Sequence, residues 1–270
     1  MDSRAYSGQT VKEGDIVLST RVRLARNLNK VPFVWRMNIS QAEDVKQRVQ
    51  RAVEHCSRGI SAGLNRTELE ALTKEQRKAM SERHLISDEL VENCTGRAMY
   101  LSPDESVVIS VNDEDHVRVQ SFAKGLELSR AYSIASALDD ALNSSLHFAF
   151  DKKLGYLTPN PMNLGNAMKA SVLLHLPALE MSGRTTSLQT QLARLGLTLK
   201  GVYREGMRTV GSLYELANQV SLGITEEQAI ENLQSITLQL CEKEREARSL
   251  LREDIHINDK VSRAYGVLKT

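Results

Sequence analysis

The sequence contains little of what nucleic-acid-binding and disulfide-stabilised proteins depend on. Aromatic residues make up 4% of its 270 residues, and the formal net charge is +1. With so few rings for base stacking and so balanced a charge, the composition argues against nucleic acid as a partner. The three cysteines, Cys56, Cys94 and Cys241, are odd in number and lack C-x-x-C spacing. This pattern predicts reduced thiols in a cytoplasmic protein and no zinc site.

Long apolar runs are also absent from the sequence. No run approaches the ~18 residues that span a membrane, and the N-terminus lacks the basic-then-apolar pattern of a signal peptide. We therefore expect no membrane partner. Neither G-x-x-x-x-G-K-[ST] nor G-x-G-x-x-G occurs, so any nucleotide site has to be built without a glycine-rich phosphate loop.

No repeat, low-complexity tract or proline-rich linker divides the chain. We expect a polar tail over residues 1–14 and one domain over residues 15–270. Two sequence patterns, Ser40-x-x-Glu43 and Thr225-x-x-Gln228, are typical of capping boxes that begin helices. Apolar periodicity predicts helices at about 40–56, 129–146 and 225–252. We also expect a polar, helix-rich stretch at about 67–83, rich in Glu, Lys and Arg, and a short helix at 185–195.

Alternation of apolar and polar residues predicts strands at 15–26, 99–101, 106–111, 116–120 and 197–203. The segment 158–171 contains two prolines near its start and is rich in asparagine. We predict a loop there that places backbone N–H groups at a helix N-terminus.

Three carboxylates stand in a row at Asp113, Glu114 and Asp115, between two of the predicted strands. Packing acids so closely is electrostatically costly unless cations from elsewhere in the chain lie beside them. An ordinary polar hairpin loop is the alternative interpretation.

The segment 18–27 supplies such cations, because Arg21 and Arg23 alternate with apolar residues and fall on one face of the predicted strand. Guanidinium groups arranged in this way can bind several phosphate or carboxylate oxygens. Together with Arg118, Lys169 and Lys200 they indicate a polyphosphate site. Surface ion pairs of little energetic value are the alternative.

Phosphoryl transfer to a guanidinium needs a carboxylate that orients the nitrogen and accepts its proton. Glu114 and Glu205 are candidates for this role, although Glu205 beside Arg204 can also be a solvated loop pair. The histidines are spaced too irregularly to predict a metal site and are expected to form structural hydrogen bonds. They include His84, His116 and His175.

Several segments, in sequence order, resemble the ATP:guanidino phosphotransferases. They are STRVRLARN at 19–27, HLIS at 84–87, NDEDHVR at 112–118, NLG at 163–165 with AS at 170–171, and GVYRE at 201–205. The likeness extends from about residue 15 to 266 and is greatest to the bacterial protein-arginine kinases. It implies an α+β fold, an antiparallel β-sheet flanked by α-helices similar to that of glutamine synthetase. It also implies a catalytic domain alone, without N-terminal or C-terminal helical domains.

The resemblance further implies that ATP and Mg2+ bind in a cleft and assigns roles by position. Phosphate contacts fall on Ser19, Arg21, Arg23, His84 and Arg118. Glu114 matches the carboxylate that holds the guanidinium, and Glu205 matches its acidic partner.

The chain departs from the family at several of these positions. Asn160 stands where the family has a reactive cysteine, and Asn166 where it has a threonine. Lys169 and Lys200 replace arginines that contact nucleotide phosphates, and lysine keeps the charge but loses the planar fork. Arg204 stands where the bacterial kinases have glycine. These changes predict weakened activity.

Two hypotheses follow. The first is an ATP-dependent kinase that phosphorylates arginine residues of proteins, with an adaptor or activator protein as a further partner. The second is a pseudokinase that keeps the fold as a binding or regulatory subunit. The retained carboxylates favour the first hypothesis, and the changes at Asn160, Asn166, Lys169 and Lys200 favour the second.

Overall fold

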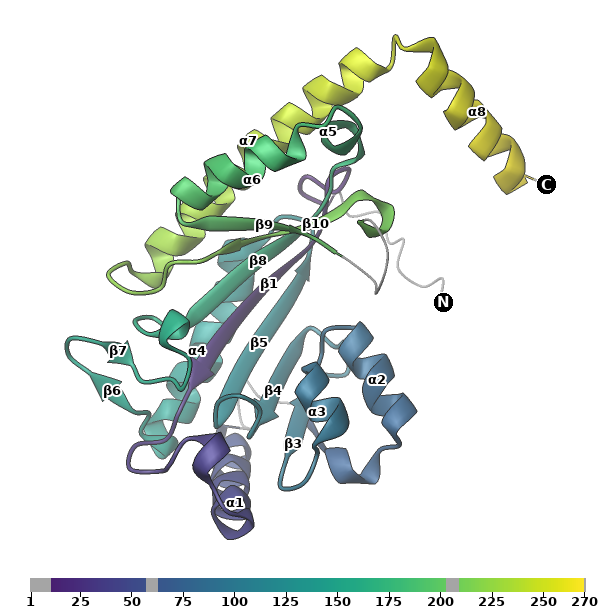
Figure 1. The fold of residues 1–270 in the computed structure, drawn as a ribbon. Helices are drawn as coiled ribbons and strands as arrows, with labels where there is room; N and C mark the ends of the chain where they lie inside the picture. The colour runs from purple at the N-terminus through teal and green to yellow at the C-terminus, as the bar shows by residue number, and fades with distance from the viewer. Residues whose placement is uncertain (1–10, 57–62, 203–208, 270) are drawn as a thin grey trace.

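The computed structural model describes residues 11–56, 63–202 and 209–269. These residues form an eight-stranded sheet in the order β2-β3-β4-β5-β1-β8-β10-β9, in which all neighbours pair antiparallel. Figure 1 shows the sheet with helices around it. The strands are β1 (Val17–Arg26), β2 (Asn65–Glu68), β3 (Ala98–Leu101), β4 (Val107–Val111), β5 (Val117–Lys124), β8 (Met168–His175), β9 (Leu197–Gly201) and β10 (Leu213–Asn218). A separate hairpin joins β6 (Phe150–Asp151) to β7 (Gly155–Tyr156).

The helices confirm the α+β class that the resemblance implies. They are α1 (Ile39–Cys56), α2 (Lys74–Glu82), α3 (Asp88–Glu92), α4 (Leu128–Leu146), α5 (Pro177–Met181), α6 (Thr185–Arg194), α7 (Glu226–Leu251) and α8 (Ile255–Lys269). Among the described residues, no helix combines the length and apolarity needed to cross a membrane.

The two faces of the sheet differ in what covers them. On one face, apolar side chains such as Val22, Val119 and Val172 join α1, α4 and α7 in the main core. On the other face, a smaller core beneath α2 and α3 includes Met99 and Val108, so it covers β3 and β4. That second face therefore stays accessible over β5, β1 and β8, where the polar side chains gather.

The capping box at Thr225 and Gln228 is confirmed, because each side chain accepts a hydrogen bond from the other residue's backbone N–H. The box predicted at Ser40 is wrong. Asn38 and Gln41 exchange the reciprocal side-chain bonds at 2.9 and 3.0 Å, so the N-cap lies two residues earlier than predicted and α1 begins at Ile39. Asparagine is as good an N-cap as serine, and the spacing to Gln41 also fits the pattern.

Three local predictions differ from the structure. The start of the predicted helix 67–83 lies in strand β2, which pairs with β3. Strand β10 was not predicted, although Tyr214 and Leu216 alternate with more exposed residues. The loop after residue 158 contains only a short 3-10 turn at Pro161–Asn163 and then enters strand β8, so it does not reach a helix N-terminus.

Candidate functional site

Strand β1 lies at the centre of the polar face and sets the spacing of the site. Arg23 is directly opposite Gln120 of β5 on one side and Lys169 of β8 on the other. Arg21, two residues earlier, is opposite Phe122 and Ser171. Because side chains alternate across a strand, Arg21 and Arg23 project from the same face. The predicted sharing of a face is confirmed.

Like charges directly opposite each other on neighbouring strands are destabilising. Neither Arg23 nor Lys169 forms a hydrogen bond or ion pair with a described residue, and both are half-buried. Burial, with Arg118 and Arg21 nearby, lowers the pKa of Arg23 to about 10. Burial also lowers the pKa of Lys169, and the neighbouring arginines act in the same direction. The fold therefore holds positive charge that an anionic ligand would neutralise.

Glu215 of β10 belongs to this face but was missed by the sequence analysis. Its Oε1 accepts a hydrogen bond from Arg21 Nη2 at 2.8 Å. Burial opposes ionisation of Glu215, but Arg21 and Lys169 outweigh it, so its pKa lies below the ordinary value. The alternation of Tyr214 and Leu216 around it was the available signal, and recognising β10 would have placed Glu215 on the polar face.

The α2–α3 segment forms a wall beside these strands. A cleft of about 440 Å3 lies between them, lined by Arg21, Arg23 and Arg118 from the sheet and by His84 and Ser87 from the wall. His84 has a left-handed backbone with φ of 61°, and burial and Arg21 lower the pKa of its ring. A neighbouring hollow of about 220 Å3 adds Ser19, Ser171 and Glu215.

The acidic segment after β4 lies at one end of this cleft. Glu114 Oε2 accepts a hydrogen bond from Arg118 Nη2 at 3.0 Å. Its other oxygen, Oε1, accepts one from Asn160 Nδ2 at 3.2 Å. The structure therefore brings Glu114, Arg118 and Asn160 together, although Asn160 comes from a loop 46 residues away.

The two acids beside Glu114 have structural partners. Asp113 binds Arg118 Nη1 at 2.5 Å and accepts a hydrogen bond from Ser87 Oγ at 2.7 Å, which links the wall to the acidic segment. Asp115 is fully buried and accepts a hydrogen bond from Asn27 Nδ2 at 2.7 Å. Burial raises the pKa of Asp115 to about 6. The cations that the acidic row requires are thus Arg118 and, at longer range, Arg23.

His116 is a structural hydrogen-bonding group, as predicted. Its Nδ1 accepts a hydrogen bond from the Leu28 backbone N–H at 2.9 Å, and its Nε2 lies 2.8 Å from the Pro32 carbonyl oxygen. The second contact assigns the ring proton to Nε2, because a carbonyl oxygen accepts only. The chain after β1 is thereby fastened to the acidic segment.

The remaining candidate residues fall into three groups. Lys200 is exposed on β9, opposite Glu215 in the strand register. Asn166 does not project into the cleft with the cations, because its side chain bonds the backbone at Met168 and Ile224. Glu205 and Arg204 lie outside the described residues.

The cleft can bind a polyanion and a cation side by side. Arg21, Arg23 and Arg118 line it with positive charge, and Lys169 lies beside Arg23 in the strand register. Glu114, bonded to Arg118, presents a carboxylate at its end. Within the described residues, no group of three or more His, Cys, Asp or Glu side chains could hold a metal ion. Magnesium bound to a polyphosphate takes most of its ligands from phosphate and water, so it needs only one or two protein carboxylates. Glu215, set among the cations, fits that requirement.

Comparisons with known proteins agree with this geometry. The family model described as ATP:guanido phosphotransferase, C-terminal catalytic domain, matches residues 44–247. The protein-arginine kinase of Desulforamulus reducens is 43% identical over 263 residues, which cover 96% of this chain and 74% of that protein. That of Halothermothrix orenii is 41% identical over 258 residues, covering 95% of this chain and 73% of that protein.

Solved structures show the same fold. The substrate-free duplicated taurocyamine kinase from Schistosoma mansoni aligns with a TM-score of 0.75 and 27% identity over 88% of this chain. The chain spans only 35% of that protein's length. Lombricine kinase aligns with a TM-score of 0.76 over 92% of this chain and 71% of its own, and at 20% identity it supports the fold alone.

Proposed function

The chain belongs to the family of ATP:guanido phosphotransferases, and from this premise we propose that it transfers the γ-phosphoryl group of ATP to arginine side chains of proteins. Relatives named protein-arginine kinase, at 43% and 41% identity, support the choice of a protein-borne arginine. The catalytic domain is proposed to comprise residues 15–270, and the cytoplasm is proposed as its location.

The observation that carries the proposal is the adjacency of charges in the cleft. Arg21 and Arg23 form a row along β1, with Lys169 beside Arg23. Arg118 is opposite Ala25, two residues further along, and its guanidinium contacts Glu114 at 3.0 Å. Triphosphate bound along the row would bring its terminal phosphate toward Glu114. A substrate guanidinium held by that carboxylate would then lie next to the phosphate it attacks.

Glu114 is proposed to orient the guanidinium and to accept its proton. A guanidinium nitrogen attacks the γ-phosphorus, the bond from that phosphorus to the β–γ bridging oxygen breaks, and ADP leaves with the electron pair. The nitrogen's proton passes to Glu114. Asn160 and Arg118 each hold one Glu114 oxygen, at 3.2 and 3.0 Å, so the carboxylate is oriented before the substrate arrives.

Further roles are proposed for the residues that surround this centre. Ser19, His84 and Lys200 join the phosphate contacts, and Glu205 serves as a second acid for the guanidinium. Magnesium, when bound with ATP, would neutralise phosphate charge, and Glu215 is the proposed carboxylate beside it.

The pseudokinase is the competing function, and a particular observation favours it. Lys169 and Lys200 replace arginines of the family. A lysine forms a single-point contact with a phosphate, whereas an arginine can form two parallel hydrogen bonds to it. If each site loses one charge-assisted hydrogen bond in the transition state, the rate falls about tenfold or more per site. We therefore propose an active enzyme with weakened activity, assisted by an adaptor or activator protein.

Phosphoryl transfer from magnesium-ATP to an arginine-rich test protein tests the proposed function. The product is read by phosphorus NMR at neutral pH, because acid cleaves the phosphorus–nitrogen bond. We expect a phosphoarginine signal from the wild type and a loss of at least about a hundredfold in Glu114→Gln. Glutamine has the same size and keeps one acceptor oxygen, but its amide nitrogen only donates, and the side chain cannot accept the proton.

Calorimetry of magnesium-ATP binding separates the two functions. Glu114→Gln should bind ATP as the wild type does, since the change lies beyond the phosphate row. ATP binding by the wild type without any phosphoarginine, even with a cellular extract added, would establish the pseudokinase. If the chain neither binds ATP nor transfers phosphate, the proposed function is overturned. A pseudokinase that depends on bound nucleotide is overturned as well.

A further inference from the structure

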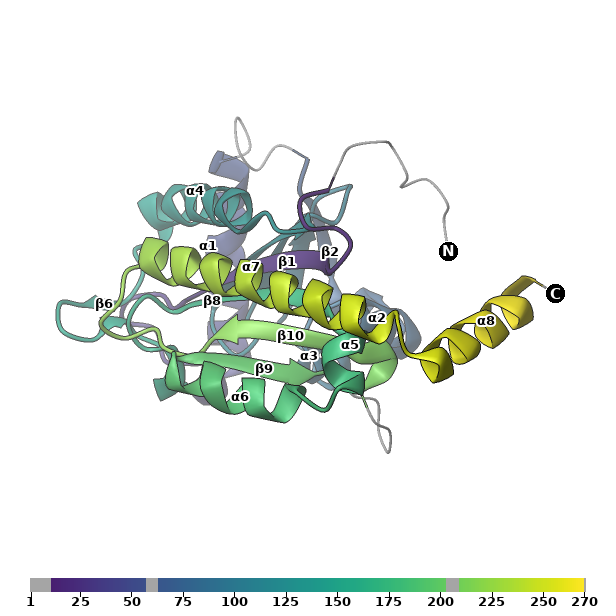
Figure 2. The same ribbon diagram turned by 90° about the horizontal axis from the view of Figure 1, so that it is seen from above.

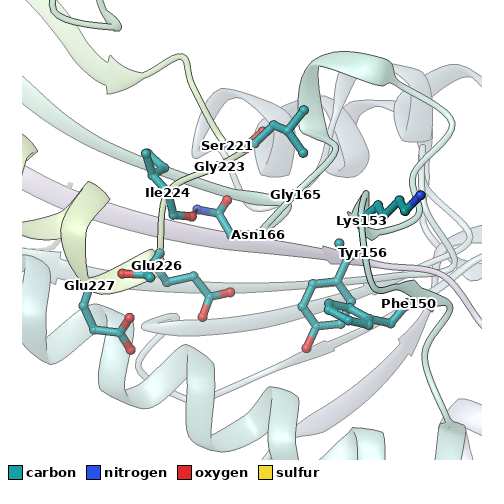
Figure 3. Close-up of a pocket in the computed structure, with 13 residues that line it drawn as sticks. Phe150, Lys153, Tyr156, Gly165, Asn166, Ser221, Gly223, Ile224, Glu226 and Glu227 are labelled. Carbon is teal, nitrogen blue, oxygen red and sulfur yellow. Dashed lines mark hydrogen bonds between the residues drawn. The ribbon is translucent and has the colours of Figure 1, made fainter.

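A second hollow, the hairpin groove, lies outside the cleft. It has a volume of about 430 Å3 and lies between the β6–β7 hairpin and the start of α7. We define it by the residues that the argument uses: Phe150, Tyr156, Gly165, Leu222, Ile224 and Glu227. Figure 3 shows the two rings on one side of the groove and the two glutamates Glu226 and Glu227 on the other.

The rim of the hairpin groove is unusually apolar for a surface. Phe150 is 61% exposed and Leu222 is 51% exposed, and both line the groove. Met162, 60% exposed, lies on the adjoining loop, where its carbonyl oxygen accepts a hydrogen bond from Ser221 Oγ. Large exposed apolar side chains that gather in this way mark interaction surfaces more often than those scattered singly.

The groove is acidic at its other end. Glu226 accepts a hydrogen bond from Tyr132 at 2.8 Å and lies 3.4 Å from the buried Arg26. Arg26 also pairs with Asp139 at 2.8 Å, so it compensates the charge of Glu226 only in part. Glu227 accepts a hydrogen bond from the same hydroxyl at 3.1 Å and forms no ion pair with a described residue. Its own backbone N–H and Tyr132 lower its pKa, so it is charged at neutral pH. Lys153 also lines the groove, but its ammonium group points away from both glutamates (Figure 3).

One loop separates this groove from the catalytic cleft. Asn160 bonds Glu114 at the start of the loop, whereas Gly165 at its end lines the hairpin groove. Gly165 carries the carbonyl that accepts the Tyr156 backbone N–H at 2.8 Å. The loop between these two residues can span at most about 17 Å. A polypeptide segment of about five residues therefore reaches from Glu114 to the groove.

We propose that the hairpin groove binds a second basic side chain of the protein substrate, a lysine or arginine within about five residues of the arginine that is phosphorylated. This proposal rests on the proposed function and extends it to substrate selection. The side chain's aliphatic stem would lie on Phe150 and Leu222, and its charge would meet Glu227. Lysine and arginine match a groove with an apolar rim and an acidic end because each has an aliphatic stem and a positively charged tip.

Charge complementarity selects this occupant over a purely apolar one. An apolar side chain would cover Phe150 and Leu222 but would desolvate Glu227 without a partner, which is unfavourable. An acidic residue would meet Glu226 and Glu227 with like charge. Tyr156 already stacks on the Arg26 guanidinium, 3.6 Å from its ring centroid, so cation–aromatic contact occurs at this hairpin.

Paired synthetic peptides test the proposal. Each pair carries one arginine and, at a spacing of up to about five residues, either lysine or glutamine. We measure kcat/KM for phosphoarginine formation and take the lysine-to-glutamine ratio as the preference. The variants are Glu227→Gln, which removes the charge, and Glu231→Gln, an exposed glutamate one turn along α7 that does not line the groove.

We expect wild type to prefer the lysine peptide by about three- to tenfold at the matching spacing. Glu227→Gln should bring that ratio close to one through a higher KM, and Glu231→Gln should retain it. In Glu227→Lys the preference should shift to a peptide with glutamate at the same position. A merely structural role of Glu227 would lower the rates of all peptides together and leave the ratio unchanged, and that result would overturn the proposal. So would an equal loss of preference in Glu231→Gln.

Direct peptide binding keeps this test separate from the proposed function. Fluorescence anisotropy of labelled peptides on the full chain measures the same preference without turnover. No peptide is phosphorylated in one possible outcome, while binding still shows the lysine preference and its dependence on Glu227. In that case the proposed function fails, but the groove proposal stands. If transfer occurs with no preference in either assay at any spacing, the groove proposal fails alone.

Discussion

Asp115 is the buried member of the acidic row, and its protonation is coupled to folding. It is fully buried, accepts a hydrogen bond from Asn27 at 2.7 Å, and lies 3.9 Å from Arg118. Burial outweighs these partners and raises its pKa from 3.8 to about 6. The folded chain therefore holds this proton more tightly than the unfolded chain does. Stability from this group is greatest below pH 3.8 and is lost as the pH rises through about 6.

Asp115→Asn should remove this pH dependence. The amide oxygen can still accept the Asn27 hydrogen bond, but no charge is buried above pH 6. Relative to the variant, the wild type should lose on the order of 3 kcal/mol of unfolding free energy between about pH 4 and 7. Urea unfolding of both proteins across that range measures the difference. Subtracting the variant's curve cancels the other carboxylates. A wild-type-minus-variant difference that stays constant with pH would show that Asp115 titrates normally.

The candidate residues show which parts of the site a sequence can reveal. Glu114 and Arg118 lie in one local motif, and Asn160 was named by its position in the resemblance, as a departure from the family. The structure joins the three through hydrogen bonds. Glu215 was not predicted as a site residue because its position depends on strand register. Only the pairing of β10 with β8 brings it to Arg21. Strand register is a long-range property, set by packing of one face, and a single segment does not contain it.

Among the elements, the loop from Thr158 to Asn166 depends most on one residue. Gly165 has φ of 106°, and a Cβ atom there would lie 2.2 Å from the Ser221 carbonyl oxygen. Gly155 is packed equally tightly, since its Cβ would lie 2.2 Å from the Gly165 carbonyl oxygen. Backbone from three segments thus meets with no space for side chains, and this contact fixes the loop that carries Asn160.

Gly165→Ala should displace that loop. We expect a loss of about 2–4 kcal/mol in unfolding free energy, from backbone strain together with overpacking. Phosphoryl transfer should also fall, because Asn160 would no longer hold Glu114 in place. Gly183→Ala is the matched control: its φ is 68°, but a Cβ would meet nothing within 4 Å. It should lose about 1–2 kcal/mol, from strain alone, and keep full activity. Equal activity of the two variants would show that the loop does not position Glu114.

Element boundaries were predictable where one segment contains the whole signal. The capping box at Thr225 and the periodicity of α4 are local, and the structure confirms both elements. The start of α1 was misplaced because Asn38 and Ser40 both fit the N-cap pattern, and only the hydrogen bonds distinguish them. Strand β2 reads as polar because it lies at the sheet edge, where half of its residues are exposed. Its pairing with β3, which residues 65–68 do not encode by themselves, makes it a strand.

In the whole molecule, one face of the sheet forms the apolar core and the other face holds the charged cleft. The helix-covered face buries most of the apolar side chains, whereas the cleft face keeps Arg23 and Lys169 without ion-pair partners among the described residues. Repulsion between these cations costs stability that the main core offsets. This division explains how a chain of near-zero net charge holds a strongly positive site.

The main body of the molecule, meaning the sheet with helices α1 to α7, ends at the C-terminal end of α7. Glu244 is completely buried, and its two oxygens accept the backbone N–H groups of Ala178 and Leu179 at 3.1 and 3.0 Å. Those N–H groups begin α5, where they have no helical partner. Helix α8, by contrast, has no buried residue and projects away from the other elements in both views (Figures 1 and 2).

Removing α8 should therefore leave the stability of the main body unchanged. A chain that ends at Glu253 should unfold within about 0.5 kcal/mol of the full chain, because surface changes away from packed features have small effects. Glu244→Ala, at the same end of the molecule, is the positive control. It leaves two buried N–H groups unpaired and should cost about 2–5 kcal/mol.

Urea unfolding at several protein concentrations measures all three chains. A loss of more than about 2 kcal/mol on removal of α8, independent of concentration, would mean that the helix packs onto the body in solution. A loss that grows with concentration would instead mean that its exposed Val261, Tyr265 and Leu268 bind a second copy.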